Sequence, residues 1–183
     1  QPKFELLKHV FGAIRENPKS FLKALKVLFR MYSESKQSLL IHLIYLLESC
    51  NVAKVCKESD VDHIHAHFGT NPAEVAMYTS IISGVPYSFT VHGPEEFDKP
   101  LTLNLNQKIK YASRVIAITN YCKSQLFRWA DYEDWQKVGI VHCGLEDKFF
   151  NEQTLNSRRE GDEYRFLCIG RLCEQKGQLL LLE

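Results

Sequence analysis

Two clusters of polar residues each follow an apolar stretch of the sequence, and both contain histidine. His67, Gly69 and Thr70 follow the first stretch, and His92 follows the second. In an open parallel sheet, ligands bind just beyond the carboxyl ends of the strands. Two such junctions in neighbouring units therefore predict a cleft in which imidazole, hydroxyl and backbone amide groups hydrogen-bond a polar ligand.

His92 is the candidate for direct participation in a reaction. It lies at the open end of an apolar stretch, is followed by Gly93 and Pro94, and precedes an acidic run that contains Glu96. A histidine that only packed in the core would be expected inside the apolar stretch. The acidic residues either form a solvated loop or accept hydrogen bonds from sugar hydroxyls, and Glu96 is the candidate for this second role.

Residues 69–72 (GTNP) have two interpretations. Asn71 as a helix cap and Pro72 at the first helical position explain the sequence without a ligand. The same amides at a helix start could instead hold a phosphate or a sugar oxygen. Spacing alone favours the first interpretation.

Three histidines alternate along the first predicted strand and therefore share one face. His63, His65 and His67 could together bind zinc. No aspartate or glutamate nearby completes a ligand pattern, so packing or hydrogen bonding to a ligand is the favoured interpretation. We predict no metal site and no cofactor, and a histidine-dependent metal hydrolase is the least favoured function.

Arg171 and Lys176 form a second candidate site near the carboxyl end. A predicted strand ends in Gly170 and is followed by these two cations before a helix begins. Backbone amides, a helix amino end and side-chain charge together suit a diphosphate.

The elements that must position these residues alternate between strand and helix. Alternation of this kind predicts an α/β fold, a Rossmann-like parallel sheet with flanking helices and right-handed crossovers. The predicted strands are 61–66, 87–91, 114–118 and 138–142, and the predicted helices between and after them are 72–82, 103–111 and 121–129.

Residues 1–150 are predicted to form one domain, with 151–163 as a polar linker. Residues 164–183 would begin a second domain, with a strand at 164–169 and a helix that starts at Gln178. Such a short strand-loop-helix unit cannot fold alone.

Three helices are predicted before the first strand, over residues 4–14, 18–30 and 37–58. The second has an apolar face (Phe21, Leu22, Leu25, Leu28, Phe29) and a basic face (Lys19, Lys23, Lys26, Arg30). It is either an ordinary surface helix with a solvated charged face or a basic amphipathic surface that rests on anionic lipid.

Composition bounds the function further. The 183 residues are 45% hydrophobic and 25% charged, as in a soluble globular protein. With 23 basic against 22 acidic side chains, no nucleic acid partner is expected. The six cysteines are scattered, which indicates reduced thiols. No signal peptide is apparent. The most apolar run, Leu39 to Leu47, is short for a membrane-spanning helix. We expect a cytoplasmic protein.

Six short motifs are distributed over the last two thirds of the chain. They are residues 65–69 (HAHFG), 84–94 (GVPYSFTVHGP), 117–119 (AIT), 141–145 (VHCGL), 170–172 (GRL) and 176–177 (KG). Together these motifs resemble the family 4 glycosyltransferases, in particular those of bacterial exopolysaccharide and colanic acid assembly. The resemblance extends from about Val61 to the end of the chain.

The resemblance implies a GT-B architecture, in which two Rossmann-like domains face each other across a cleft. The first domain would bind a glycan or lipid-linked sugar acceptor, through His67, Gly69, Thr70 and Glu96, and the second the nucleotide-sugar donor. His92 would lie at the reacting centre, and Arg171 and Lys176 would grip the donor diphosphate. Such enzymes retain anomeric configuration and need no bound metal.

Two departures from the family limit this inference. The family's first strand with its glycine-rich loop, and most of its donor domain, have no counterpart in these 183 residues. We therefore expect a fragment or a truncated product with little or no transferase activity of its own, working at the cytoplasmic membrane face. The alternative is a noncatalytic lobe that binds a glycan, a membrane or a partner subunit.

Overall fold

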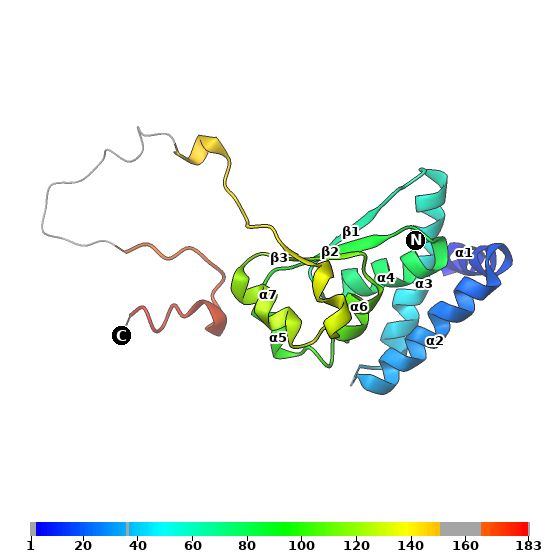
Figure 1. Ribbon diagram of the computed structural model, residues 1–183, viewed down its shortest axis with the longest axis horizontal. Helices are drawn as coiled ribbons and strands as arrows, with labels where there is room; N and C mark the ends of the chain where they lie inside the picture. Colours follow the sequence, from blue (N-terminus) through cyan, green and yellow to red (C-terminus); the bar gives the residue numbers. More distant parts are fainter. Residues whose placement is uncertain (1–2, 36, 151–165, 183) are drawn as a thin grey trace, which may run out of the picture. The chain divides into compact units, whose positions relative to one another are not determined.

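A computed structural model describes residues 3–35, 37–150 and 166–182 (Figure 1). The chain forms two compact units, Gln1–Cys143 and Gly144–Glu183. The unit boundary thus comes before position 150, and the predicted linker at 151–163 lies outside the described residues. The two units are considered separately below.

The first unit contains a four-stranded parallel sheet. Its order is β1 (Ile64–His67), β2 (Tyr87–Val91), β3 (Arg114–Ala117) and β4 (Val138–Ile140). Register pairs Ala66 with Phe89, Phe89 with Val115, and Val115 with Val138. Helices connect the parallel strands, so the predicted α/β, Rossmann-like class is confirmed.

The connecting helices begin and end where local chemistry requires. The first crossover helix, α4 (Asn71–Ser83), has proline in its first turn and ends at Gly84, whose φ of 83° is the left-handed conformation that glycine adopts without steric cost. The others are α6 (Leu105–Tyr111) and α7 (Asn120–Phe127), and α7 is capped by the Thr119 hydroxyl. Two short elements were not predicted: α5 (Pro94–Asp98) and the 3₁₀ helix η1 (Tyr132–Lys137).

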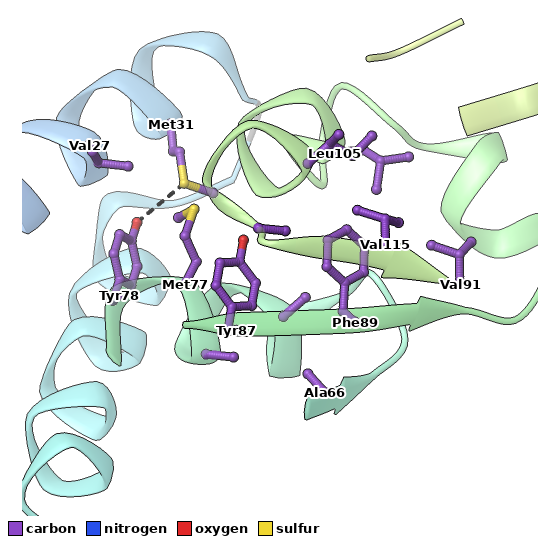
Figure 2. Close-up of a cluster of buried hydrophobic side chains, with 14 of the residues drawn as sticks. Val27, Met31, Ala66, Met77, Tyr78, Tyr87, Phe89, Val91, Leu105 and Val115 are labelled. Atoms are coloured by element: carbon purple, nitrogen blue, oxygen red, sulfur yellow. Dashed lines mark hydrogen bonds between the residues drawn. The ribbon is translucent and has the colours of Figure 1, made fainter. Parts of the chain in front are cut away.

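One face of the sheet packs against the helices in the hydrophobic core. Figure 2 shows Tyr87, Phe89 and Val91 pointing from β2 into a cluster with side chains of α4, α6 and α2. Tyr87 and Phe89 are fully buried, and the Tyr87 hydroxyl donates to the Lys108 carbonyl at 2.5 Å. Because successive side chains of a strand alternate, Ser88, Thr90 and the histidines of β1 belong to the other, polar face.

The N-terminal helices α1 (Lys3–Glu16), α2 (Pro18–Glu34) and α3 (Leu39–Glu58) pack together, and α2 and α3 also pack against α4 (Figure 1). The predicted apolar face of α2 was partly wrong. Its buried residues are Ala24, Val27, Leu28 and Met31, whereas Leu22 and Phe29 are 56% and 52% exposed. These two apolar side chains therefore share the solvent-facing surface of α2 with its lysines.

The helix α3 continues beyond the apolar run Leu39 to Leu47, to Glu58. Among the described helices, it alone has the length and composition to cross a membrane, with a mean hydropathy of 1.5 and 33% of that window buried. A core helix passes the same test, and α3 packs against α1 and α4, with His42 and Ser49 fully buried.

In the second unit, the described part of the predicted strand, residues 166–169, has no strand pairing, and no helix follows Gln178 within the described residues. The unit contains the 3₁₀ turns η2 (Asp147–Phe150) and η4 (Glu174–Lys176). Side chains such as Phe166 and Ile169 are more than 80% exposed, which agrees with the argument that one strand-loop-helix unit lacks a core of its own.

Candidate functional site

The sheet brings the two histidine-containing junctions together. Thr90 pairs with His67, so the loops that follow β1 and β2 leave the sheet side by side. His67 Nδ1 lies 2.9 Å from His92 Nε2, and the ring centroids are 5.2 Å apart. One of these two nitrogens carries the proton of the hydrogen bond, so the two imidazoles cannot both be fully protonated while it persists.

Glu96 ties the two loops to each other. Its Oε1 accepts from the Gly69 amide at 3.1 Å and the His92 amide at 3.4 Å, and its Oε2 accepts from the Gly93 amide at 3.1 Å. At the third position of α5, the bond to Gly93 is the glutamate half of a capping box. Glu96 is 1% exposed, so it holds backbone, and the expectation that it contacts substrate is not supported by this geometry.

Lys108 is buried and binds the backbone of the loop that follows β1. Its ammonium donates to the carbonyls of Gly69, at 3.1 Å, and Thr70, at 2.9 Å, and lies 3.7 Å from Glu74 Oε2. Burial lowers the pKa of Lys108 to about 8, although the Glu74 carboxylate opposes that shift. A buried cation thus fixes a loop that carries candidate site residues.

Glu74 extends this buried network to the N-terminal helices. Its Oε1 lies 2.5 Å from His42 Nδ1 and accepts from the Tyr78 hydroxyl at 3.3 Å. The other ring nitrogen of His42 lies 3.2 Å from the Ser35 hydroxyl. Glu74 lies in the first turn of α4, and nothing in the sequence indicated a partner 34 residues away at Lys108.

The polar face of the sheet carries a hydrogen-bonded row of side chains. Ser88 Oγ lies 2.7 Å from both His63 Nε2 and His65 Nδ1, and His65 Nε2 lies 2.9 Å from Thr90 Oγ1. Partial desolvation lowers the pKa of His65, and the neighbouring imidazoles lower it further. The three strand histidines do share one face, as predicted, and two of them bind hydroxyls of β2.

Gly69 and Thr70 differ in which of their polar groups already have a hydrogen-bond partner in the protein. Both backbone polar groups of Gly69 are used by Glu96 and Lys108, and a Cβ at this position would lie 3.2 Å from Leu105. A side chain at this position would crowd Leu105, so Gly69 has a packing role, and its predicted ligand contact stays a prediction. Thr70, the N-cap residue where Asn71 was expected, makes no side-chain capping bond, so its hydroxyl is not used by the helix start.

A groove of about 530 Å³ lies along the outer side of β1. Its lining includes His65, His67, Asn71 and Pro72, together with apolar residues of α3 and α4. Among the described residues, no group of three or more histidine, cysteine, aspartate or glutamate side chains is arranged to hold a metal ion.

Arg171 and Lys176 lie in the second unit and are described there alone. The Arg171 carbonyl accepts from the Gln178 side chain at 2.7 Å, and the Lys176 side chain packs near Gly170, 3.6 Å from where its Cβ would be. Lys176 ends η4, directly before Gly177 with a φ of 64°. The two cations therefore flank one short turn.

Comparison with known protein families identifies the family to which the sheet and its loops belong. The sequence model of Glycosyltransferase Family 4 matches residues 12–149, which is more than half of the chain. The chain belongs to Glycosyltransferase Family 4. No curated protein matches it.

In this Family 4 domain, the match includes α2, α3, the whole sheet and both histidine loops. Family membership makes it a glycosyltransferase domain, and the substrates of such enzymes are a sugar donor and an acceptor. The side chains that the sequence analysis missed, Lys108, Glu74 and Ser88, all support the loops or strands that carry the predicted residues.

Proposed function

We propose that this domain serves the transfer of a sugar from a nucleotide-sugar donor to a glycan or lipid-linked acceptor, with retention of anomeric configuration, in exopolysaccharide assembly. The observation that carries the proposal is the His67–His92 pair beyond the carboxyl ends of β1 and β2. Ligands of open α/β sheets bind at this edge. The Family 4 match supplies the reaction class.

In the proposed reaction, positive charge develops on the donor sugar while negative charge grows on the departing diphosphate. Arg171 and Lys176 would stabilise that diphosphate without a bound metal. Nε2 of His92 is occupied by His67, so Nδ1 is the nitrogen left to hydrogen-bond a sugar hydroxyl. His92 is proposed to orient the sugar and is not assigned as a base.

Replacing His92 or Arg171 with alanine in the two-domain enzyme is expected to lower turnover about 100-fold or more, because each removes an interaction that strengthens in the transition state. Release of nucleoside diphosphate from a panel of nucleotide sugars would measure the rate. His9→Ala, on α1, is the matched control and should turn over normally. Unchanged rates in both site variants would contradict the assignment of these residues.

A second candidate function is favoured by the surface of α2. Leu22 and Phe29 are more than half exposed among the exposed cations Lys19, Lys26 and Arg30. Basic residues with apolar neighbours on one helix face suit an anionic lipid surface. We therefore propose a cytoplasmic domain that rests on the membrane, a role that a noncatalytic lobe could also perform.

Charge reversal on α2 tests this membrane role. The Lys19→Glu, Lys26→Glu double variant is expected to bind phosphatidylglycerol vesicles at least ~30-fold more weakly than wild type, since each basic residue near the surface contributes about 1 kcal/mol. Cosedimentation at low salt would measure binding, and added salt should weaken it. Lys99→Glu, Lys110→Glu has the same net charge and should bind like wild type. Equal losses of vesicle binding in both double variants would indicate that binding depends on the net charge of the protein and not on the surface of α2.

A further inference from the structure

Phe68 has an unusual backbone conformation for a bulky residue. Its φ is 72°, in the left-handed region that residues other than glycine, asparagine and aspartate rarely adopt. Its side chain is nevertheless 49% exposed, so core packing does not account for the conformation. Backbone strain of this kind costs about 1–3 kcal/mol and persists only where the surroundings impose it.

The surroundings do impose it. The Phe68 amide donates to the Thr90 carbonyl at 2.8 Å, which continues the β1–β2 ladder by one residue. The next residue, Gly69, is held by Glu96 through its amide and by Lys108 through its carbonyl. Fixed backbone on both sides leaves Phe68 to make the turn, and its ring is carried to the surface beside the histidine pair.

The Phe68 ring and the two imidazoles lie together. The centroids of Phe68 and His92 are 4.7 Å apart at an interplanar angle of 43°, and those of His67 and His92 are 5.2 Å apart. The lining of the groove along β1 includes His67 and Asn71. The result is an exposed apolar ring face bordered by hydrogen-bonding groups.

That combination matches the surface of a pyranose ring. Such a sugar has an apolar C–H face and a rim of hydroxyls, so it stacks on an aromatic side chain while its hydroxyls bind polar neighbours. Aromatic residues with satisfied polar surroundings supply large contact area with defined geometry. Glycine would adopt this backbone conformation without strain, so the presence of an exposed aromatic residue at this position is the observation that a purely structural role leaves unexplained.

We propose that Phe68 is the stacking platform for a pyranose ring of the acceptor, with His67 and His92 at its rim. The inference rests on the proposed transferase function and extends it to a residue of the acceptor side. The platform belongs to the first unit, whereas the residues proposed to grip the donor diphosphate, Arg171 and Lys176, belong to the second.

The test uses this 183-residue chain and methyl α- and β-D-glucopyranoside as probes. Saturation-transfer NMR at about 10 mM sugar should show transfer of saturation from the protein to the C–H protons of the sugar ring, with wild type and with Phe68→Trp. Phe68→Gly should bind about fivefold more weakly, the change that corresponds to about 1 kcal/mol of lost stacking. The glycine variant should also fold at least as stably as wild type, because glycine adopts positive φ freely.

Phe68→Leu is the second variant, since it keeps the strain and much of the volume but removes the aromatic face. It should bind as weakly as Phe68→Gly, and it replaces that variant if glycine impairs folding. Binding of both within twofold of wild type, or no saturation transfer with wild type, would overturn the proposal. The assay needs neither donor nor turnover, so failure of the transferase function and failure of the platform are separate results.

Discussion

Replacing Lys108 with methionine is expected to lower the free energy of unfolding by about 3–5 kcal/mol, the usual cost of breaking a buried ion pair by removing one partner. Methionine preserves the unbranched shape but donates no hydrogen bond. The carbonyls of Gly69 and Thr70 would lose their donor, and Glu74, 2% exposed, would lose the cation at 3.7 Å. Each buried acceptor left unsatisfied costs about 1–3 kcal/mol.

Equilibrium unfolding in urea would measure the change for the whole chain, from the midpoint at an unchanged slope. Lys110→Met is the matched control on the same helix. Lys110 is 51% exposed in its side chain and lies 4.0 Å from Asp131, so its loss should cost less than about 1 kcal/mol. A loss below about 1 kcal/mol for Lys108→Met would show that the buried network contributes little to stability.

The second large effect is expected at Glu96. Glu96→Ala would leave the amides of Gly69, His92 and Gly93 without their common acceptor in a site that is 1% exposed. Hydrogen bonds to a charged group contribute about 1.5–3 kcal/mol each, and partial access of water reduces the sum, so we expect a loss of about 3 kcal/mol. The two histidine loops would also be free to separate.

Two measurements distinguish these consequences. Urea unfolding reports the stability loss, and imidazole ¹H–¹⁵N NMR spectra report whether the His67–His92 hydrogen bond survives. Glu95→Ala changes the neighbouring, exposed glutamate of α5 and should alter neither measurement. A stable Glu96→Ala variant with the imidazole signals of wild type would contradict the role of Glu96 as the tie between the loops.

Strands and helix ends with strong local signals could be predicted from the sequence. The strand Tyr87–Val91 has the predicted bounds because it is bordered by Pro86 and by His92-Gly93. Gly84 ends α4 in the left-handed conformation typical of a glycine at this position. The pairing of His67 with His92 follows from parallel topology, since neighbouring strand ends meet at one edge.

Features set by tertiary packing could not be predicted. Leu22 and Phe29 fit a helical apolar stripe, yet α2 turns Ala24 and Met31 inward instead, because packing against α3 and α4 determines which part of a wide stripe is buried.

The roles of the charged residues were equally hidden. Lys108 and Lys110 are both lysines in one short helix, and only the fold shows that the first is buried and the second exposed. Glu96 was one of three acids after His92, and its selection by three amides depends on the meeting of two loops. Phe68 carries no local signal for positive φ, which its flanking hydrogen bonds impose.

The serine on the polar face has a consequence for how the imidazoles carry their protons. A hydroxyl has a single proton, and Ser88 Oγ is 2.7 Å from both His63 Nε2 and His65 Nδ1. When Ser88 donates to His63, His65 must carry its proton on Nδ1; when it donates to His65, His63 must carry one on Nε2. Because the hydroxyl can donate to only one of them, at least one of the two imidazoles must carry a proton on the nitrogen that faces Ser88, and the tautomer open to each histidine depends on the other.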